Sequence, residues 1–389
     1  MRILFITNSP IEYSSSANIR NTALIKGFME NGHDIDILTC YPDKSSKYYD
    51  STIAKDLNLA IKYIDRADDS NEQELENIKY KRSNVYHKVR NNLYKIYNAL
   101  SIYDPRKRNL RFMDKIEINV SYDVVISSSD PKSSHLIAEK IVEKFNIKQW
   151  IQYWGDPLTT DINKNGIIPQ FILKNEELRL LEKASAAFYV SPITLKLQKE
   201  MFKEISGKIH YFPIPIQING YDEKIITISD NIKIGYYGDY FSRDRNIMPL
   251  VNACEKNDFC LEIFGSSDVK ITNKDNIQVN ERAPFEVIKM HEKNTEILVC
   301  LCNKKGGQIP GKIYHYAATN KPILLILDGE YQQTVHDWFG KYPNYFICEN
   351  NADSIREAII KIQKSKLVLS PIKDFDSRSI ASNMLNKLN

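Results

Sequence analysis

The stretch Lys305-Gly-Gly-Gln-Ile-Pro-Gly-Lys-Ile-Tyr-His-Tyr-Ala-Ala-Thr-Asn-Lys-Pro-Ile-Leu-Leu-Ile-Leu-Asp328 decides how the rest of the chain is interpreted. Its adjacent glycines, Gly306 and Gly307, predict a loop whose backbone can come close to a ligand. Pro310 suits the first position of a helix, because its missing N–H would be unpaired there in any case. The run Pro322–Leu327 predicts a short buried strand. The stretch therefore predicts a loop, a helix and a strand in succession.

A lysine stands in the first turn of this predicted helix. Lys312 opposes the helix dipole there, and such a position is tolerated best where an anion is bound. Unpaired N–H groups, two glycines and a lysine at a helix start together favour a phosphate site. His315 shares a helix face with Lys312, so both side chains can address one ligand. An ordinary loop and helix with a solvated lysine explains the same residues, and this stretch alone leaves both interpretations open.

Length and composition limit the class of protein. A chain of 389 residues is too long for one typical core and predicts two domains. No apolar run approaches the ~20 residues that span a bilayer. The start, Met1–Thr7, resembles a strand rather than a signal peptide, so we expect a cytoplasmic protein. The six cysteines are scattered without a Cys-x-x-Cys pair, which favours free thiols over a metal cluster. A net charge of +4 does not by itself imply nucleic acid.

Predicted strands and helices alternate along both halves of the chain. Arg2–Thr7 and Ile35–Thr39 predict strands on either side of a helix, and this β-α-β unit predicts a parallel sheet. The loop after the first strand lacks Gly-x-Gly-x-x-Gly, which disfavours a dinucleotide site there. The polar, proline-containing stretch 213–230 predicts an interdomain linker. The pattern predicts an α/β fold with doubly wound domains at 1–213 and 231–370.

One turn of the first half carries a candidate carboxylate. Trp154-Gly-Asp-Pro157 directly follows a predicted strand, and ligand groups collect at the carboxyl ends of strands in parallel sheets. Asp156 is therefore placed to orient or deprotonate a hydroxyl. A turn-forming aspartate before a proline is the alternative interpretation.

The amino-acid sequence of the stretch Lys305–Asp328 also resembles that of a known family. The Pro310-Gly-Lys312 helix start, followed by the Lys321-Pro-Ile strand, resembles the donor-binding segment of GT-B glycosyltransferases, especially the family 4-like enzymes of bacterial polysaccharide assembly. The resemblance covers nearly the whole chain in outline. It implies two Rossmann-like domains facing an interdomain cleft, with a last helix, 375–389, that packs back on the first domain. Many of these enzymes carry two glutamates with seven residues between them, where this chain has Gly307 and His315.

The resemblance implies a donor site for a nucleotide diphosphate sugar in the second domain. In the family, a glycine lets the diphosphate approach and a nearby cation neutralises it; Gly238 fits the first role, and Arg243 or Arg245 fits the second. Lys312 with one of these arginines would form a cationic clamp on the leaving pyrophosphate, in place of a metal. His315 would touch the donor sugar. The implied donor-binding residues are Gly238, Arg243, Arg245, Gly265, Arg282, Gly307, Gln308, Pro310, Gly311, Lys312 and Tyr314.

The resemblance also implies an acceptor site in the first domain. There the polar loop after the first strand faces the cleft, and an Asp-Pro turn stands at the cleft edge. A solvated loop explains each residue of the first-strand loop equally well. The acceptor candidates are Asn8, Ser9, Arg20, Trp154 and Asp156. The candidate catalytic residues of the whole chain are Asp156, Lys312, Arg243 and His315.

The function implied by the resemblance is glycosyl transfer. A hexosyltransferase-type enzyme would move a sugar from a UDP- or GDP-sugar to a saccharide or lipid-linked saccharide in surface polysaccharide assembly, with retention of configuration and without a metal or other cofactor. A nucleotide-sugar epimerase of the same fold and a non-catalytic partner subunit are the alternatives. The epimerase would consume the donor without an acceptor, and the partner subunit would not turn over.

Residues 79–111 interleave basic and aromatic side chains. This combination suits an anionic membrane surface and also nucleic acid. A solvated helical face with inward tyrosines explains most of the residues more simply. A lipid-linked acceptor would place the enzyme at the inner face of the membrane, so peripheral attachment through this segment is a secondary hypothesis. Nucleic-acid binding ranks last, because no nucleic-acid motif accompanies the charge.

Overall fold

The chain divides into two compact units. The computed structural model describes residues 1–46, 48–55, 57, 59–66, 100–161 and 167–388. Unit 1 comprises Met1–Val190, Thr194–Pro215 and Ser377–Asn389, and unit 2 comprises Ser191–Ile193 and Ile216–Asp376. Each unit has its own parallel sheet and its own hydrophobic core.

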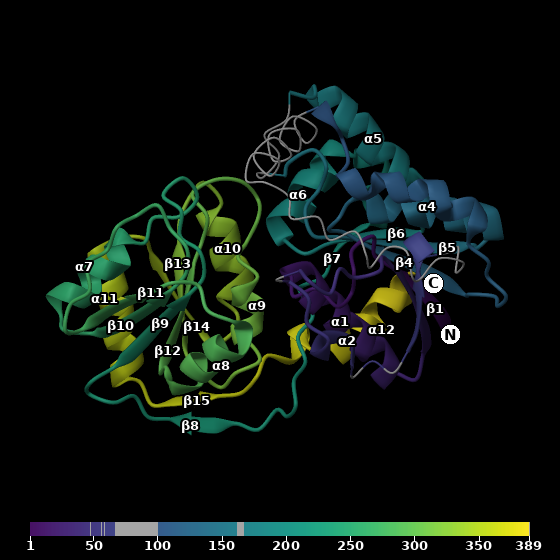
Figure 1. Ribbon diagram of the computed structural model, residues 1–389. Helices are drawn as coiled ribbons and strands as arrows, with labels where there is room; N and C mark the ends of the chain where they lie inside the picture. The colour runs from purple at the N-terminus through teal and green to yellow at the C-terminus, as the bar shows by residue number, and fades with distance from the viewer. Residues whose placement is uncertain (47, 56, 58, 67–99, 162–166, 389) are drawn as a thin grey trace. The chain divides into compact units, whose positions relative to one another are not determined.

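Unit 1 is built on a seven-stranded parallel sheet (Figure 1). In spatial order, its strands are β3 (Ala60–Tyr63), β2 (Asp34–Thr39), β1 (Arg2–Ile6), β4 (Val124–Ser128), β5 (Gln149–Trp154), β6 (Ala186–Tyr189) and β7 (Ile209–Tyr211). Its α-helices are α1 (Ser16–Glu30), α2 (Thr52–Lys55), α4 (Ser133–Phe145), α5 (Gln170–Lys183), α6 (Pro192–Met201) and α12 (Ser377–Leu385). Its 3-10 helices are η1 (Ile64–Arg66), η2 (Pro105–Lys115), η3 (Lys203–Lys208) and η5 (Asn386–Leu388). The strand order reverses between β1 and β4, which is where such sheets bind ligands.

Two apolar layers enclose this sheet. Successive side chains of a strand point to opposite faces, so Ile3 and Phe5 join a core with α1 and α12, whereas Leu4 and Ile6 join a core with α4 and α5. All of β4 is buried for the same reason, because helices cover both faces of a parallel sheet.

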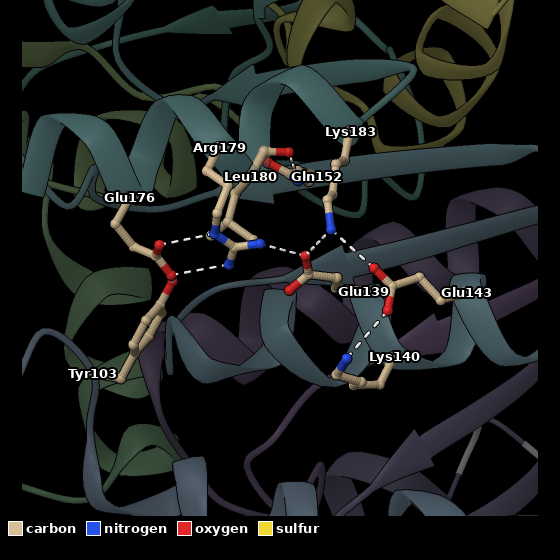
Figure 2. A network of polar contacts seen from close by, with 9 residues as sticks. All are labelled: Tyr103, Glu139, Lys140, Glu143, Gln152, Glu176, Arg179, Leu180 and Lys183. Carbon is tan, nitrogen blue, oxygen red and sulfur yellow. Dashed lines mark hydrogen bonds and ion pairs between the residues drawn. The ribbon is translucent and has the colours of Figure 1, made fainter.

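Ion pairs reinforce the layer formed by α4 and α5 (Figure 2). Glu139 of α4, which is 8% exposed, accepts hydrogen bonds from Arg179 and Lys183 of α5. Arg179 also donates to both carboxylate oxygens of Glu176, at 2.8 and 2.9 Å. The Tyr103 hydroxyl donates to Glu176 at 2.7 Å. The network thus attaches the chain just before η2 to the helical layer of unit 1.

The C-terminal helix α12 completes unit 1 by packing on α1. Met384 of α12 lies in the same core as Leu24 and Phe28 of α1. The two helices meet at Gly27, where a Cβ atom would stand 2.2 Å from the carbonyl oxygen of Ser377. Only a residue without a side chain permits this approach.

Unit 2 repeats the architecture with a six-stranded parallel sheet. In spatial order, its strands are β11 (Ile277–Asn280), β10 (Cys260–Phe264), β9 (Lys233–Tyr237), β12 (Ile297–Leu301), β13 (Ile323–Leu327) and β14 (Tyr345–Glu349). Its helices are α7 (Met248–Lys256), α8 (Phe285–Asn294), α9 (Lys312–Tyr316), α10 (Gln332–Phe339), α11 (Ala352–Lys364) and the 3-10 helix η4 (Lys373–Phe375). The strand order reverses between β9 and β12. The predicted α/β class with two doubly wound halves is confirmed.

Some predicted elements differ from the observed ones. The stretch 213–230, predicted to be a linker, contains β8 (Lys224–Ile226), which pairs antiparallel with β15 (Leu367–Leu369). Both strands have three residues, too few for a periodic pattern to be visible. Helix α9 begins at Lys312, so Pro310 precedes it instead of opening it.

Only part of the basic segment 79–111 is described. Residues 79–99 lie outside the described residues, and 105–111 belong to η2, which exposes Lys107, Arg108 and Arg111. In the part of the chain that the structure describes, no helix is long and apolar enough to cross a bilayer.

We predict that Gly27→Ala lowers the unfolding free energy by about 1–3 kcal/mol, because the added methyl group collides with the α12 backbone. Chemical denaturation of the full chain measures the change. Gly207→Ala is the matched control: a Cβ there meets nothing within 4 Å, so its effect should stay within about 0.5 kcal/mol. Stabilisation by Gly27→Ala, the usual result inside a free-standing helix, would contradict the proposed contact.

Candidate functional site

Two glycines shape the carboxyl ends of β9 and β10. The Gly238 N–H donates to the Phe264 carbonyl at 2.8 Å, and the Gly265 N–H donates to the Asn280 carbonyl at 3.2 Å. A Cβ on Gly265 would stand 2.0 Å from the Gly238 carbonyl oxygen, so protein packing itself requires glycine there. A Cβ on Gly238 would meet its nearest neighbour at 3.8 Å. This is ordinary van der Waals contact with Tyr236 and Arg245, so packing does not require glycine at 238, and the position adjoins the Arg245 guanidinium.

Arg245 is built into this edge of the sheet. Its Nη1 donates to the Asp239 carbonyl at 2.8 Å, its Nε donates to Asn303 Oδ1 at 2.9 Å, and its guanidinium also bonds to the Tyr236 hydroxyl. A guanidinium carries five N–H donors, so these three bonds fix its position and leave donors for an anion. Asn303 Nδ2 in turn donates to the Gln308 carbonyl at 3.2 Å. The half-buried arginine thus links the loops that follow β9 and β12.

The other two candidate arginines are more exposed. Arg243 pairs with its neighbour Asp244, at 2.9 Å between Nε and Oδ1, and its side chain is 66% exposed. Arg282 lies 3.7 Å from the Asp239 carboxylate and is 74% exposed. The structure thus distinguishes the half-buried, hydrogen-bonded Arg245 from the exposed Arg243, whereas the sequence spacing did not choose between them.

Lys312 is engaged with helix α8. Its Nζ lies 2.5 Å from Glu292 Oε1 and 5.3 Å from the centre of the Tyr316 ring. In this structure Lys312 is paired with Glu292, whereas Arg245 bonds to Asn303 and the Asp239 carbonyl. Lys321 holds the same end of α8 by donating to its last carbonyls, including that of Glu292 at 2.7 Å.

The remaining residues of the α9 segment lie at different depths. Tyr314 is fully buried, and its ring packs edge-on against Phe339 and Phe375. It is a core residue of unit 2 rather than part of an exposed ligand surface. His315 is half-buried; burial, reinforced by Lys312, lowers its pKa to about 4. The imidazole is therefore neutral at pH 7 and offers a hydrogen bond without a charge.

The glycine-rich loop before α9 meets two acidic residues. Gln308 and Gly306 line a cavity of about 10 Å³ together with Asp328 and Glu330. The cavity has room for about one water molecule. Sequence reasoning did not single out these acids, although Asp328-Gly-Glu330 directly follows β13, a position where ligand groups collect. Gly307 turns its carbonyl to the Ser191 hydroxyl at 2.6 Å. Pro310 and Gly311 precede α9 without a side-chain cap.

An ionic cluster stands at the carboxyl ends of β4 and β5 in unit 1. Lys132 Nζ bonds to Asp161 Oδ2 at 2.6 Å and to Asp130 Oδ1 at 3.3 Å. Asp156 lies within the electrostatic reach of both aspartates. Burial, followed by repulsion from Asp130 and Asp161, raises the pKa of Asp156 to about 7, against the attraction of Lys132 and Arg20. Asp156 can therefore exchange a proton near neutral pH.

Arg20 supports this cluster from helix α1. Its Nη2 donates to the Ser129 carbonyl, and its guanidinium lies 4.9 Å from the centre of the Tyr153 ring. A Cβ on Gly155 would stand 2.7 Å from Arg20 Nη1. The glycine of the Trp-Gly-Asp-Pro turn thus makes room for the arginine, next to Asp156.

The other three acceptor candidates serve the scaffold in this structure. Asn8 is fully buried; its Nδ2 donates to Ser133 Oγ at 2.8 Å, and its Oδ1 accepts from Asn109 at 2.9 Å. Trp154 is buried in the core of unit 1. Ser9 gives its backbone carbonyl to a hydrogen bond from β2 at 2.6 Å. The structure therefore brings Arg20 and Asp156 together and places Asn8 and Trp154 in the interior.

Solved structures share this fold. TarM is 10% identical over 100% of this chain and 95% of its own, with a TM-score of 0.57. The catalytic domain of starch synthase IV from Arabidopsis thaliana, bound to ADP and acarbose, is 8% identical over 100% and 94%, with a TM-score of 0.57. An S. aureus TarM mutant in complex with fondaparinux, alpha-GlcNAc-glycerol and UDP is 10% identical over 100% and 96%, with a TM-score of 0.56.

These likenesses and the two parallel sheets define the GT-B fold for this chain. No protein-family model and no curated protein matches the sequence. The comparisons therefore establish the architecture, and the function has to be argued from the sites.

We predict that Asp156→Asn stabilises the protein at pH 8 and loses this advantage toward pH 4. The folded state holds the Asp156 proton more tightly than the unfolded state does, so the unfolding free energy falls as pH rises from about 4 to about 7. Asparagine removes that dependence. We expect a gain of about 1–2 kcal/mol at pH 8, less than the full shift corresponds to, because the carboxylate keeps some contact with solvent.

Unfolding midpoints measured between pH 4 and 8 test this prediction. Glu204→Gln, which removes the same charge from an exposed position of unit 1, should leave the midpoint nearly unchanged. A less stable Asp156→Asn protein at pH 8 would show that the carboxylate is a favourable partner in the cluster and not a strained one.

Proposed function

We propose that the protein is a glycosyltransferase that moves a sugar from a nucleotide diphosphate sugar to a hydroxyl of a saccharide or lipid-linked saccharide. The observation that carries the proposal is the edge of unit 2 where Gly238, at which packing does not require glycine, adjoins the fixed guanidinium of Arg245. The fold supports it, since solved structures of this fold hold UDP or ADP. A UDP- or GDP-sugar is the proposed donor.

Arg245 is proposed as the principal ligand of the donor diphosphate. Its spare N–H groups can bond to phosphate oxygens bidentately, which is the recognition that a guanidinium gives best. The bonds to Asp239 and Asn303 keep it in place while charge develops on the leaving group, so no reorganisation is required during the reaction. Together with Lys312, this role is proposed to take the place of a metal at the leaving diphosphate.

Lys312 is proposed to join Arg245 when the donor binds. In the structure its ammonium is neutralised by Glu292. A diphosphate carries more negative charge than one carboxylate, and this stronger attraction is proposed to drive the exchange of partners. The α9 segment would then contact the donor through Lys312, while His315 offers its neutral imidazole to the sugar.

Asp156 is proposed to act on the acceptor. The glycosidic C–O bond to phosphate breaks, a C–O bond to the acceptor oxygen forms, and the acceptor proton passes to Asp156 or to the leaving phosphate. A carboxylate with a pKa near 7 orients the hydroxyl and accepts its proton near neutral pH. We propose retention of the sugar configuration, as the family resemblance implies.

The proposed setting is surface polysaccharide assembly in a bacterium, on the cytoplasmic side of the membrane. Exposed Lys107, Arg108 and Arg111 of η2 would favour attachment to anionic lipid, with about 1 kcal/mol for each cation close to the surface.

The direct test is turnover with a panel of UDP- and GDP-sugars, with and without saccharide and lipid-linked acceptors. Transfer that requires an acceptor and releases a nucleoside diphosphate supports the proposal. Donor consumption without an acceptor would identify an epimerase instead. Binding without any turnover would identify a partner subunit.

We predict that Arg245→Ala weakens nucleoside diphosphate binding by about 10- to 100-fold, because a charge-assisted hydrogen bond contributes about 1.5–3 kcal/mol. Arg243→Ala is the matched control. It removes the same charge from the same loop, but from a side chain directed to solvent, and should change the affinity less than about threefold. Calorimetric titration with UDP and GDP measures both. Equal losses in the two variants would mean that only the summed charge of the loop matters.

We predict opposite effects from the two partners of the Lys312 ion pair. Lys312→Ala should weaken nucleoside diphosphate binding and lower turnover by about 10²-fold, as expected when a charge-stabilising group is lost. Glu292→Gln frees the lysine and should leave binding equal or tighter. Titration and turnover of both variants test the exchange. Loss of stability in both, with the affinity unchanged, would make the pair purely structural.

A further inference from the structure

Unit 2 contains a cavity near the amino ends of its strands, away from the carboxyl ends where Gly238 and Arg245 lie. A cavity of about 350 Å³ lies between β10, β11 and the end of α8. Its lining includes Lys233, where β9 begins, and Cys260, where β10 begins. Gly238 and Arg245, in contrast, follow the carboxyl end of β9. The cavity is therefore separate from the proposed donor site, and its size is at the lower end of ligand pockets, which measure about 300–1,000 Å³.

A preorganised polar network forms one wall of this cavity. Glu262 of β10 accepts from His291 Nδ1 of α8, at 2.9 Å to Oε1, and from the Tyr237 hydroxyl at 3.0 Å to Oε2. The Tyr237 hydroxyl also lies 2.5 Å from Thr295 Oγ1. Tyr237 reaches this position because Gly235 has no side chain: a Cβ there would stand 2.5 Å from the phenol ring. The strand sequence thus directs a tyrosine into the network.

The network sets the chemistry that His291 presents. With Nδ1 directed to the Glu262 carboxylate, the neutral form of the ring carries its proton on Nδ1 and leaves Nε2 as an acceptor. The side chains of His291 and Glu262 are 37% and 25% exposed, so both remain accessible from the cavity. Side chains that are already held by hydrogen bonds to neighbouring residues lose little conformational freedom when they bind a ligand.

The other lining residues favour an uncharged, hydroxyl-rich ligand. The amides of Gln278 and Asn294 each offer donors and an acceptor. With His291 neutral, the two carboxylates, Glu262 and Asp275, outnumber the one cation, Lys233, so an anionic ligand is disfavoured. Within the described residues, no group of three or more side chains that could hold a metal ion is present. A phosphate site and a metal site are both poor fits.

We propose that this cavity binds one sugar unit of an uncharged saccharide. Alternating hydroxyl groups, each both donor and acceptor, match the Glu262 carboxylate, the His291 acceptor nitrogen and the two amides. The cavity gives the donor-binding unit a second carbohydrate site at the opposite end of its strands from Arg245. Such a site would hold an extended glycan while transfer takes place elsewhere on the chain, and it requires no nucleotide.

Saturation-transfer NMR on the full chain tests the proposal, with D-glucose, D-galactose, N-acetylglucosamine, maltose and lactose as probes. We expect saturable binding of at least one sugar, at about millimolar affinity. Gln278→Trp fills the cavity from an exposed position and should weaken this binding by about tenfold or more. Gln333→Trp makes the same change at an exposed position of α10 and should not alter sugar binding.

Titration of the same proteins with UDP and GDP separates this proposal from the proposed function. Both tryptophan variants should bind nucleoside diphosphate as the wild type does. Sugar binding that is equal in the wild type and Gln278→Trp would place the sugar elsewhere and overturn the proposal, as would the absence of saturable binding for every probe. Sugar binding that depends on Gln278, in a protein that binds no nucleoside diphosphate, would support this site and count against the donor site alone.

Discussion

The backbone contact between Gly238 and Gly265 is the constraint on which the carboxyl edge of unit 2 depends. Parallel strands end at a common edge, and the loops that leave β9 and β10 have to pass each other there. Glycine at 265 allows a separation that no other residue permits. The loop after β9 can then return along the edge, so that Arg245 reaches both the Asp239 carbonyl and Asn303. The arginine proposed to bind the donor is thus positioned by the absence of a side chain on a neighbouring strand.

The carboxyl edges of the two parallel sheets carry different charged groups. In unit 2, the edge places a guanidinium next to Gly238. In unit 1, the corresponding edge holds three aspartates around Lys132, and Gly155 makes room for a buried arginine. The first arrangement suits an anionic ligand. The second holds a carboxylate that is ready to take up a proton. This difference in charge is consistent with a division into donor and acceptor units.

The fold was largely predictable from the sequence, because alternating buried strands and amphipathic helices leave few other topologies. The pairing of β8 with β15 was not, since two three-residue strands carry no periodic pattern. The candidate site was predictable in part. Asp156 was named from its position after a strand, and the family resemblance named Arg243 or Arg245 without choosing between them. The burial of Asn8 and Tyr314 depends on tertiary packing that spacing does not encode.

The ion pair of Lys312 shows a further limit of sequence reasoning. Lys312 at a helix start suggested a phosphate site. Its partner in the structure, Glu292, lies on another helix and belongs to no sequence motif. Likewise, Asp328 and Glu330 follow a strand in the expected place but belong to no recognised pattern. Charges that are paired across elements become visible only when the elements are packed.

The packing of α12 on α1 also constrains how the protein can be made. Helix α1 is translated before unit 2, and its partner α12 is translated after it. Until then, Leu24 and Phe28 lack the cover that Ile380 and Met384 provide. Unit 2 is continuous apart from residues 191–193, so it can fold as its strands emerge, whereas unit 1 has to wait for its final helix. Most of unit 1 is therefore translated before unit 2 but is completed after it, and an apolar face of α1 stays uncovered in the meantime.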